Sequence, residues 1–421
     1  MEDDESHNAN DISIKIIRAM LEEAQPLLTD ECYIHRVPHY IRKTNEDAYT
    51  PKVVSIGPFH HGNEKLLKME YHKRLYCRQF IERSEPKNLE TFVSYVQEVE
   101  AEVRGCYSDD IKLSKEEHVM VILVDCCFIL EFLFKSHFHQ WSRHDVSFLL
   151  PQLLTHLKYD LLLIENQVPF FVLDKLYTLA FPSTLNPPLV TFTPYILPDD
   201  IFSGNNDVGR IVHFTDLARK HLLLSSALSI SKCSRKAHVT HLASATKLRD
   251  AGVKFKVNED SKGLLDLELS DHTLRIPPVT VDDSTEVVLR NLLAFEQCHC
   301  IDESYLNDYI CVIDFLIDTD KDVDLLIKKG IIKNWLGDSN AVAKMFNGLG
   351  VSILTSDFNT KYICILEELN DFCQKSWNQK KASLKRDYCN TQWRTLASIA
   401  GIVLLLLTIV QTVFSILQVV H

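Results

Sequence analysis

Apolar residues recur every three or four positions along most of the chain, and this spacing predicts helices with one face buried against a core. In segment 89–103, Leu89, Phe92 and Val96 fall on one face and predict a single amphipathic helix. The run VMVILVDCCFILEFLF, which starts at Val119, is apolar on all sides apart from two acids. It predicts a helix at the centre of the core, because its acids argue against a membrane span.

Further helices are predicted by the same spacing and by the residues that end helices. The stretch DLLLIENQ, residues 160–167, predicts a helix that Pro169 breaks, and PFFVLDKLYTLAF begins the next helix at that proline. TKLRDAG predicts a helix that ends at Gly252, and VDDSTEVVLRNLLAFEQC predicts one that is capped by Ser284 or its acidic neighbours. The chain is therefore expected to be mainly helical.

One short stretch changes from helical spacing to a period of two. In LLDLELSDHTLRIPP, Leu265, Leu267 and Leu269 alternate with other residues before a turn, and this pattern predicts a small β-hairpin. Additional helices are predicted over 305–317, 323–329 and about 361–385. The predicted fold class is mainly α: a helical globular domain with a small β-hairpin element, followed by one C-terminal transmembrane helix.

Composition divides the part of the chain before that last helix. Residues 1–30 predict an acidic N-terminal tail with a short helix, and residues 31–394 predict the main domain. Prolines and the polar, basic run SISKCSRKAHVT indicate a connection at 181–238. This connection joins two helical blocks, 31–180 and 239–390.

The final segment, residues 395–420, reads TLASIAGIVLLLLTIVQTVFSILQVV and contains no charged residue. As a helix it would be about 39 Å long at ~1.5 Å per residue, against a hydrocarbon core of ~30 Å. A core helix of this length without a charge is rare, so the segment predicts a transmembrane anchor. The predicted anchor residues are Leu396, Ile399, Ile402, Leu405, Ile409, Val413 and Leu417.

Basic residues precede the predicted anchor, and the positive-inside rule places their side in the cytoplasm. The membrane-flanking residues are Lys380, Lys381, Lys385, Arg386, Trp393 and Arg394. The predicted topology is a single-pass tail anchor in a lipid bilayer with the N-terminal domain in the cytoplasm. The length of the predicted span favours the plasma membrane over an endomembrane. A cleaved lipid-anchor signal is disfavoured, because the N-terminus does not resemble a secretory leader.

Charge and motif content disfavour several functions. The formal charge of −12, from 57 acids against 45 Lys and Arg, argues against a nucleic-acid partner, which needs a concentrated basic surface. The chain has neither a GxxxxGK[ST] loop nor a GxGxxG helix start, so no nucleotide and no other cofactor is predicted. The twelve cysteines lie scattered in apolar runs, and we expect mostly free thiols facing the cytosol.

The stretch VVSIGPFHHG contains the residues that most resemble an active-site loop. Adjacent histidines project in different directions, so His60 and His61 are poorly placed to chelate one metal, and no HExxH spacing accompanies them. Ser55 lies outside a GxSxG turn. Gly57 with the following proline more simply marks a turn before a helix capped by Asn63. We therefore interpret the loop as structural.

Three other groups admit both a structural and a functional interpretation. They are the basic segment from Lys375 to Arg394; Asp125 inside the apolar run; and Cys298, His299 and Cys300 with Cys311. The first is either a binding site for anionic lipid or a solvated flank of the anchor. Glu70 with Lys73 and Arg74 predicts only ordinary surface ion pairs. Asp125 is either a catalytic carboxylate or the buried partner of a cation or helix N-terminus, and the second interpretation is favoured. The third group imitates a zinc cluster, but residues two apart on a helix diverge, so no metal site and no catalytic residue is predicted.

Several stretches in order resemble one known family. They are IHRVPHYIRKTNEDAYTPKVVSIGPFHHG with LLKMEYHK, then DLLLIENQVPFFVL, LRDAGVKFK, LRIPPVTVDD, NLLAFEQC and ASIAGIVLLLLTIVQT. From about Ile34 to the C-terminus the chain is similar to the plant domain of unknown function 247 family. The resemblance implies one C-terminal span, no established enzymatic activity and no agreed catalytic or binding residues. The chain departs from the family pattern at Cys126, where a glycine is expected.

The resemblance and the predicted anchor together suggest a function. We expect a non-enzymatic interaction or recognition module that presents its domain to an unidentified protein partner from a membrane. Signalling is one setting, and reproductive recognition of the self-incompatibility kind is another, because some grass members of the family are implicated there. The alternative is a membrane-associated enzyme of unknown reaction built around Asp125 or around His60 and His61.

Overall fold

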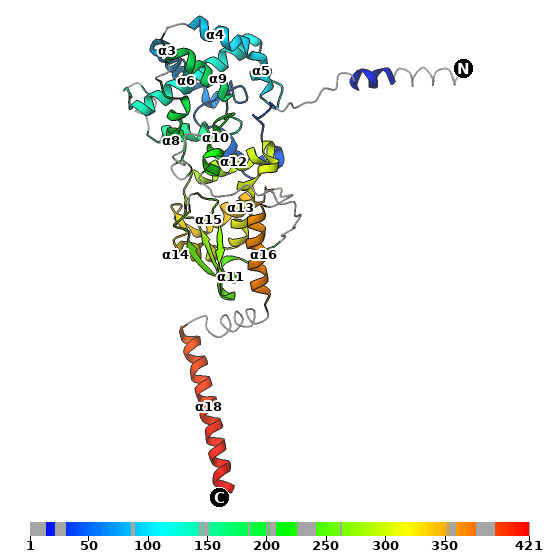
Figure 1. Ribbon diagram of the computed structural model, residues 1–421, viewed down its shortest axis with the longest axis vertical. Coiled ribbons are helices and arrows are strands. Elements are labelled where there is room, and N and C mark those ends of the chain that lie inside the picture. The colour runs from blue at the N-terminus through cyan, green and yellow to red at the C-terminus, as the bar shows by residue number, and fades with distance from the viewer. Residues whose placement is uncertain are drawn as a thin grey trace, which may run out of the picture.

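The structure is a computed structural model of the 421-residue chain. It describes residues 14–21, 31–85, 89–142, 145, 151–183, 186–198, 201, 208–224, 241–261, 263–351, 353, 359–375 and 392–420. Helices dominate the described residues, as the fold-class prediction requires. They form an elongated body with the C-terminal helix below it (Figure 1).

Helix α6, Lys115–Phe138, is the centre of the first half of the body. It starts at a capping box in which Ser114 Oγ accepts the amide of Glu117, and it ends at His139 in the left-handed conformation. Buried residues cover nearly all of its circumference, which confirms the predicted central helix. The helices packed on it are α3 (Leu67–Arg83), α4 (Leu89–Glu98), α5 (Glu100–Gly105) and α9 (Phe170–Ala180).

Helix α12, Thr285–His299, has a similar position in the second half. Its first turn is capped by Asp282, whose Oδ1 accepts the amides of Ser284 and Thr285 at 2.9 and 3.0 Å. An acidic neighbour of Ser284 is thus the cap, one of the two predicted choices. The helices packed on it are α10 (Phe214–Leu224), α13 (Tyr305–Leu316) and α15 (Ser339–Gly350). The second half also contains α11 (Ala245–Ala251), α14 (Asp320–Lys328) and α16 (Thr360–Gln374).

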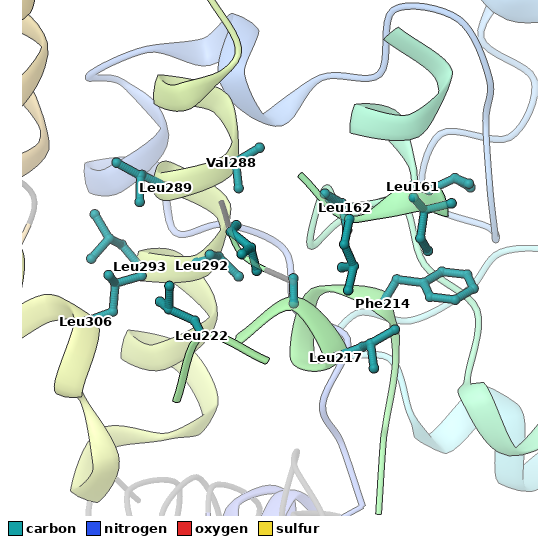
Figure 2. Close-up of a cluster of buried hydrophobic side chains, with 14 of the residues drawn as sticks. Leu161, Leu162, Phe214, Leu217, Leu222, Val288, Leu289, Leu292, Leu293 and Leu306 are labelled. Carbon is teal, nitrogen blue, oxygen red and sulfur yellow. The ribbon is translucent and has the colours of Figure 1, made fainter. Parts of the chain in front are cut away.

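The two halves share one apolar core. Figure 2 shows Leu161 and Leu162 of the first half near α10, and the leucines of α10 near those of α12. A buried ion pair crosses the same place: Arg219 Nε lies 3.0 Å from Glu296 Oε1, and neither side chain is more than 4% exposed. Glu296 also accepts the amide of Leu306 at the start of α13. Helix α10 falls within the predicted connection 181–238, whose composition did not indicate it.

Five short strands among the described residues form two small sheets. In the first sheet, with the order β1-β3-β2, β1 (Lys254–Val257) is parallel to β3 (Thr273–Ile276), which is antiparallel to β2 (Glu268–Ser270). The pair β2 and β3 confirms the predicted hairpin, and both of its turn residues, Asp271 and His272, have positive φ. The second sheet pairs β4 (Val279–Val281) with β5 (Ile332–Asn334). The remaining short elements are α2 (His39–Arg42), α8 (Pro151–Asp160) and the 3₁₀ segments Glu46–Tyr49, Glu64–Leu66, Leu189–Ile196 and Ile301–Glu303.

Two predicted helices are wrong: one is divided in two and the other does not form. The helix expected over 89–103 is broken at Val99, and the break directs the buried Glu100 toward α6, where its Oε1 lies 2.8 Å from His118 Nδ1. The helix expected over 160–167 does not form. There, Gln167 Nε2 donates to two backbone carbonyls of the segment at 2.7 Å each, in place of the helical amides.

The predicted transmembrane residues lie in α18, Gln392–Val420. The large apolar side chains described in this helix are exposed, and they include Leu396, Ile399, Ile402, Leu405, Ile409 and Val413; Leu417 belongs to the same helix. Over the ranges given above, no helix is both long enough and apolar enough to qualify as a membrane span, so the structure does not support that assignment. Trp393 and Arg394 lie at the start of α18, and Lys380, Lys381, Lys385 and Arg386 are outside the described residues.

The buried residue His213 has contacts on both ring nitrogens. Its Nε2 lies 3.2 Å from the carbonyl oxygen of Tyr33, and its Nδ1 accepts the amide of Asp216 at 3.2 Å. These contacts suit the neutral ring, with the proton on Nε2. Burial lowers the pKa of His213 to about 3, and the nearby His35 and His299 act in the same direction.

We expect acid to destabilise the fold through His213. Because its pKa is about 3 in the fold and ~6.5 in an unfolded chain, the native state binds fewer protons between these values. Its contribution to the free energy of unfolding is therefore complete above pH ~6.5 and falls by up to ~1.4 kcal/mol per pH unit toward pH 3. Urea unfolding at pH 7 and pH 5 measures this loss. His213→Gln should lose less stability between the two pH values than the natural protein, whereas the exposed control His39→Gln should not differ from it.

Candidate functional site

The segment 51–57, which precedes the histidine pair, is buried apart from Lys52 and does not belong to a strand. Its backbone amides are bonded by a side chain instead: the carboxylate of Asp160 accepts those of Lys52, Val53 and Val54 at 2.9, 2.6 and 2.9 Å. Burial raises the pKa of Asp160 to about 6, although the three amides oppose the rise. Asp160 therefore fixes the path of the segment from the end of α8.

Asn166 and Gln167 continue this support. Asn166 Oδ1 accepts the amide of Ile56 at 2.7 Å, and its Nδ2 donates to the carbonyl of Val54 at 3.0 Å. Gln167 Oε1 accepts the amide of Phe214 at 3.0 Å, which connects the segment to α10. The side-chain amides of Asn166 and Gln167 thus bond to the protein backbone, not to a ligand.

A buried ion pair lies beneath the turn at Gly57. Lys73 Nζ is 2.5 Å from Asp125 Oδ1 and donates to the carbonyl of Ser55 at 2.8 Å, while Asp125 Oδ2 accepts the amide of Gly57 at 2.8 Å. Each side chain of the pair is 1% exposed. The prediction of a surface pair between Glu70 and Lys73 is thus wrong in one respect, because Lys73 is buried. The pair itself forms, with Lys73 Nζ 2.7 Å from Glu70 Oε1.

The charges of this pair depend on each other. Burial raises the pKa of Asp125 to about 6, and Lys73 opposes that rise. Burial alone would lower the pKa of Lys73, but Asp125 outweighs it and the pKa is raised. Both groups are therefore charged at neutral pH, and Asp125 has the cationic partner that its structural interpretation required.

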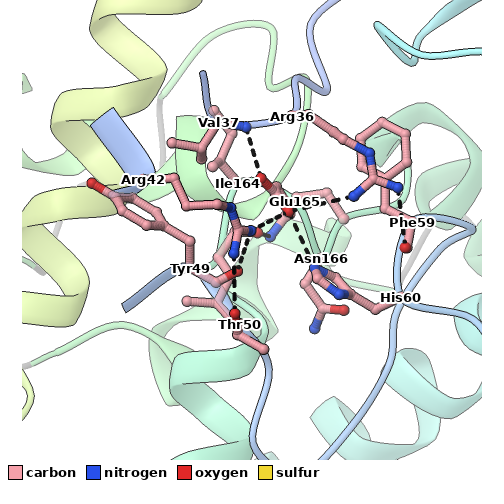
Figure 3. Close-up of polar contacts among 12 residues, drawn as sticks. Arg36, Val37, Arg42, Tyr49, Thr50, Phe59, His60, Ile164, Glu165 and Asn166 are labelled. Atoms are coloured by element: carbon pink, nitrogen blue, oxygen red, sulfur yellow. Dashed lines mark hydrogen bonds and ion pairs between the residues drawn. The ribbon is translucent and has the colours of Figure 1, made fainter. Parts of the chain in front are cut away.

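Glu165 is the centre of a cluster that reaches the surface (Figure 3). Its Oε1 accepts the amide of Val37 at 2.7 Å, and its Oε2 lies 2.6 Å from Arg42 Nη2 and 3.4 Å from His60 Nε2. Arg36 is 3.7 Å away on the outer side, with its guanidinium over the ring of Phe59. Burial would raise the pKa of Glu165, but His60 and Arg42 outweigh it and hold the pKa below its usual value.

The structure does not bring the predicted enzyme residues together. His60 faces Glu165, whereas Asp125 pairs with Lys73 and is fully buried. His61 lies near Glu117 at the start of α6, where it adds to the lowering of the Glu117 pKa by hydrogen bonds from Ser114. Across the described ranges, no three His, Cys, Asp or Glu side chains are arranged to hold a metal ion, and these ranges include Cys298, His299, Cys300 and Cys311.

The stretch ENQ, residues 165–167, has a role that its pattern does not predict. The pattern places these three polar residues, which follow four apolar ones, in a helix, but each is at most 1% exposed and bonds to a different part of the chain. The signal was present in the composition. A run of three polar side chains between LLLI and VPFF would have no partners on a buried helix face.

Comparison with known proteins places these observations in a family context. A family model of plant proteins of unknown function, DUF247, matches residues 34–407. The UPF0481 protein At3g47200 of Arabidopsis thaliana is 29% identical over 418 residues, covering 92% of this chain and 87% of that protein. The putative UPF0481 protein At3g02645 of the same plant is 23% identical over 478 residues, covering 90% and 89%. No solved structure is significantly similar to the chain.

Gly57 should tolerate no side chain. Its φ is +70°, and a Cβ there would overlap the carbonyl oxygen of Gln167, so we expect Gly57→Ala to lower the free energy of unfolding by ~3 kcal/mol or more. Gly62 is a matched control, because its φ is +78° with no atom within 4 Å of a Cβ. Gly62→Ala should lower it by only ~1 kcal/mol. Urea unfolding of the two variants measures the difference, and equal losses would contradict the close approach.

Loss of Glu165 should be far more destabilising than loss of a surface acid. Glu165→Ala removes a carboxylate that is 1% exposed and leaves the Val37 amide and Arg42 without their acceptor, so we expect a loss of ~3 kcal/mol. Asp109→Ala is the control, because Asp109 pairs with Arg36 at 2.8 Å on the surface. Its loss should lie within ~1 kcal/mol. Thermal unfolding at pH 7 compares the melting temperatures of the two variants. Equal melting temperatures would contradict the central role of Glu165.

Proposed function

Because the chain belongs to the DUF247 family of plant proteins of unknown function, we propose its function from its own residues: a non-enzymatic interaction module that α18 anchors in a membrane. The module faces the cytoplasm and binds a protein partner in signalling or recognition. The plasma membrane is the proposed host. The relatives, both UPF0481 proteins, have names that state no activity.

The observation that carries this proposal is the exposure of α18. Leucine, isoleucine and valine side chains along this helix are between 48% and 65% exposed, and the segment 395–420 contains no charged residue. Contiguous apolar surface of this kind is unfavourable in water and marks a site that lipid or protein covers. The basic residues before the helix support a cytoplasmic body through the positive-inside rule.

The polar groups around the histidine pair support the non-enzymatic part of the proposal. Asp125, Asp160 and Glu165 are at most 3% exposed and bond to backbone amides. A catalytic acid or base has to reach a substrate within hydrogen-bond distance. These carboxylates are instead suited to holding a rigid scaffold for binding at the surface.

Protease treatment of the full-length protein tests the anchor and its orientation. With a tag at each end, the protein is placed in sealed plant microsomes whose cytosolic face is outside, and protease is added. We expect digestion of the N-terminal tag and resistance of the protein to alkaline carbonate extraction, because the body faces the cytosol and α18 lies in the bilayer. A protected N-terminal tag would refute the orientation, and complete extraction by carbonate would refute the anchor.

A charge placed at the centre of α18 provides the matched variants. Leu405→Arg with Ile409→Arg should abolish resistance to carbonate, since each central arginine costs ~2.5–3.5 kcal/mol of insertion free energy. Leu396→Arg is the control, because a charge near the end of the helix can reach the interface. Equal extraction of both variants and the natural protein would mean that α18 is not in the bilayer.

A further inference from the structure

Strand β1 has an open edge. It is the outer strand of the β1-β3-β2 sheet and pairs only with β3 among the described residues. The amides of Lys254 and Asn258 donate toward β3, to His272 and Ile276, at 2.9 Å each. In a parallel pair the bonding residues alternate, so the amide and carbonyl groups of Phe255 and Val257 point away from β3. These groups are available to another extended chain.

A surface groove of about 550 Å³ runs beside β1. It is lined by β1 and the residues after it, by Arg275 of β3 and by the end of α14. Five cationic side chains line it: Lys254, Lys256, Arg275, Lys328 and Lys329. Two acids, Glu259 and Asp260, lie at one end.

The five cations lack acidic partners in the described part of the chain, where none of them forms a salt bridge. Lys256 even lies directly opposite Arg275 in the strand register, an arrangement that is destabilising for like charges. The clustering is unusual because the whole chain has a net charge of −12. An anionic partner would remove this repulsion.

We propose that this groove binds an extended acidic peptide segment of a partner protein, which adds as a strand to the free edge of β1. Its backbone would bond to Phe255 and Val257, and carboxylates at alternate positions would meet Lys254 and Lys256, which project from one face of β1. Lys328 and Lys329, which also line the groove, would add to the attraction for these carboxylates. The proposal rests on the interaction role proposed above and names its partner class, but it does not depend on the anchor.

Edge lysines also have a simpler role, since they keep sheets from pairing with one another. That role accounts for Lys254 and Lys256, which belong to the edge strand. It does not account for Lys328 and Lys329, which come from a helix, or for Arg275 on the inner strand β3. Convergence of three elements on one groove favours recognition of an anion.

The test uses the purified full-length protein in detergent and two fluorescein-labelled peptides of about eight residues, enough to cover a strand of this length. One alternates Asp with Val and the other alternates Lys with Val. We expect the acidic peptide alone to bind, with an affinity that falls as salt rises. Hydrogen exchange should slow at the amides of Phe255 and Val257 when it binds, because strand addition bonds them. Binding without this protection, or equal binding of both peptides, would overturn the proposal.

Charge-reversal variants locate the site. Lys256→Glu with Lys328→Glu should weaken binding of the acidic peptide by about tenfold or more, since like charges would then face each other. Lys333→Glu is the matched control, because Lys333 is exposed on β5 and does not line the groove. It should leave the affinity unchanged. Equal effects of the two changes would overturn the assignment, and the exchange measurement on the natural protein decides the matter if the double variant does not fold.

Inorganic tripolyphosphate distinguishes a strand site from a general anion site. We expect it to displace the acidic peptide only at much higher concentration, because it cannot bond to the strand edge. Displacement at equal concentration would overturn strand addition in favour of a phosphate site. Carbonate extraction of the microsomes reports on the anchor separately, so failure of the groove and failure of the anchor give different results.

Discussion

The packing of the first half of the body depends on the hydrogen bonds between the Asp160 carboxylate and the backbone amides of residues 52–54. A buried segment without a strand partner leaves its backbone groups without bonds, and each such group is costly. Asp160 satisfies three amides at once, and Asn166 satisfies the next part of the segment. Asp160 is the last residue of α8 and Asn166 follows shortly after it, so one short stretch of chain fixes both parts of segment 51–57.

The same network extends into the second half of the body. Asn291 of α12 accepts the amide of Ile164 at 3.0 Å and donates to the carbonyl of Ala48 at 2.8 Å. Gln167 reaches α10, and α10 in turn pairs with α12 through Arg219 and Glu296. The resemblance to an active site has its origin here. Buried carboxylates with shifted pKa values occur in structural networks as well as in catalysis, and in this chain they bond to backbone.

Sequence patterns predicted the elements whose apolar spacing is long and regular. Helix α6 and the hairpin β2–β3 are examples, because burial on all sides and strict alternation each leave one interpretation. The patterns failed where polar side chains replace regular backbone bonds, as at residues 160–167. They also missed β1, β4 and β5. These strands pair in parallel with distant segments, so no adjacent turn marks them as it marks the hairpin. At the site, Asp125 has the cationic partner that its structural interpretation expected. The partners of Lys73 and Glu165 depend on tertiary contacts, so no local pattern predicted them.

The arrangement of charges sets the groove beside β1 apart from the rest of the body. Buried carboxylates elsewhere are bonded to a cation or to backbone amides, as at Asp125, Asp160 and Glu296, whereas the cations around β1 form no salt bridge with any described residue. The end of α16 lies beside this groove: the ring of Phe372 stacks on His272 at 4.1 Å between centroids and lies next to Gly252, two residues before β1. The chain therefore leaves the body toward α18 close to the start of β1. If α18 holds the protein at a membrane, a peptide bound along β1 lies near that membrane. The hydrogen-bond network of the first half need not change. Anchoring and recognition then belong to the same end of the body.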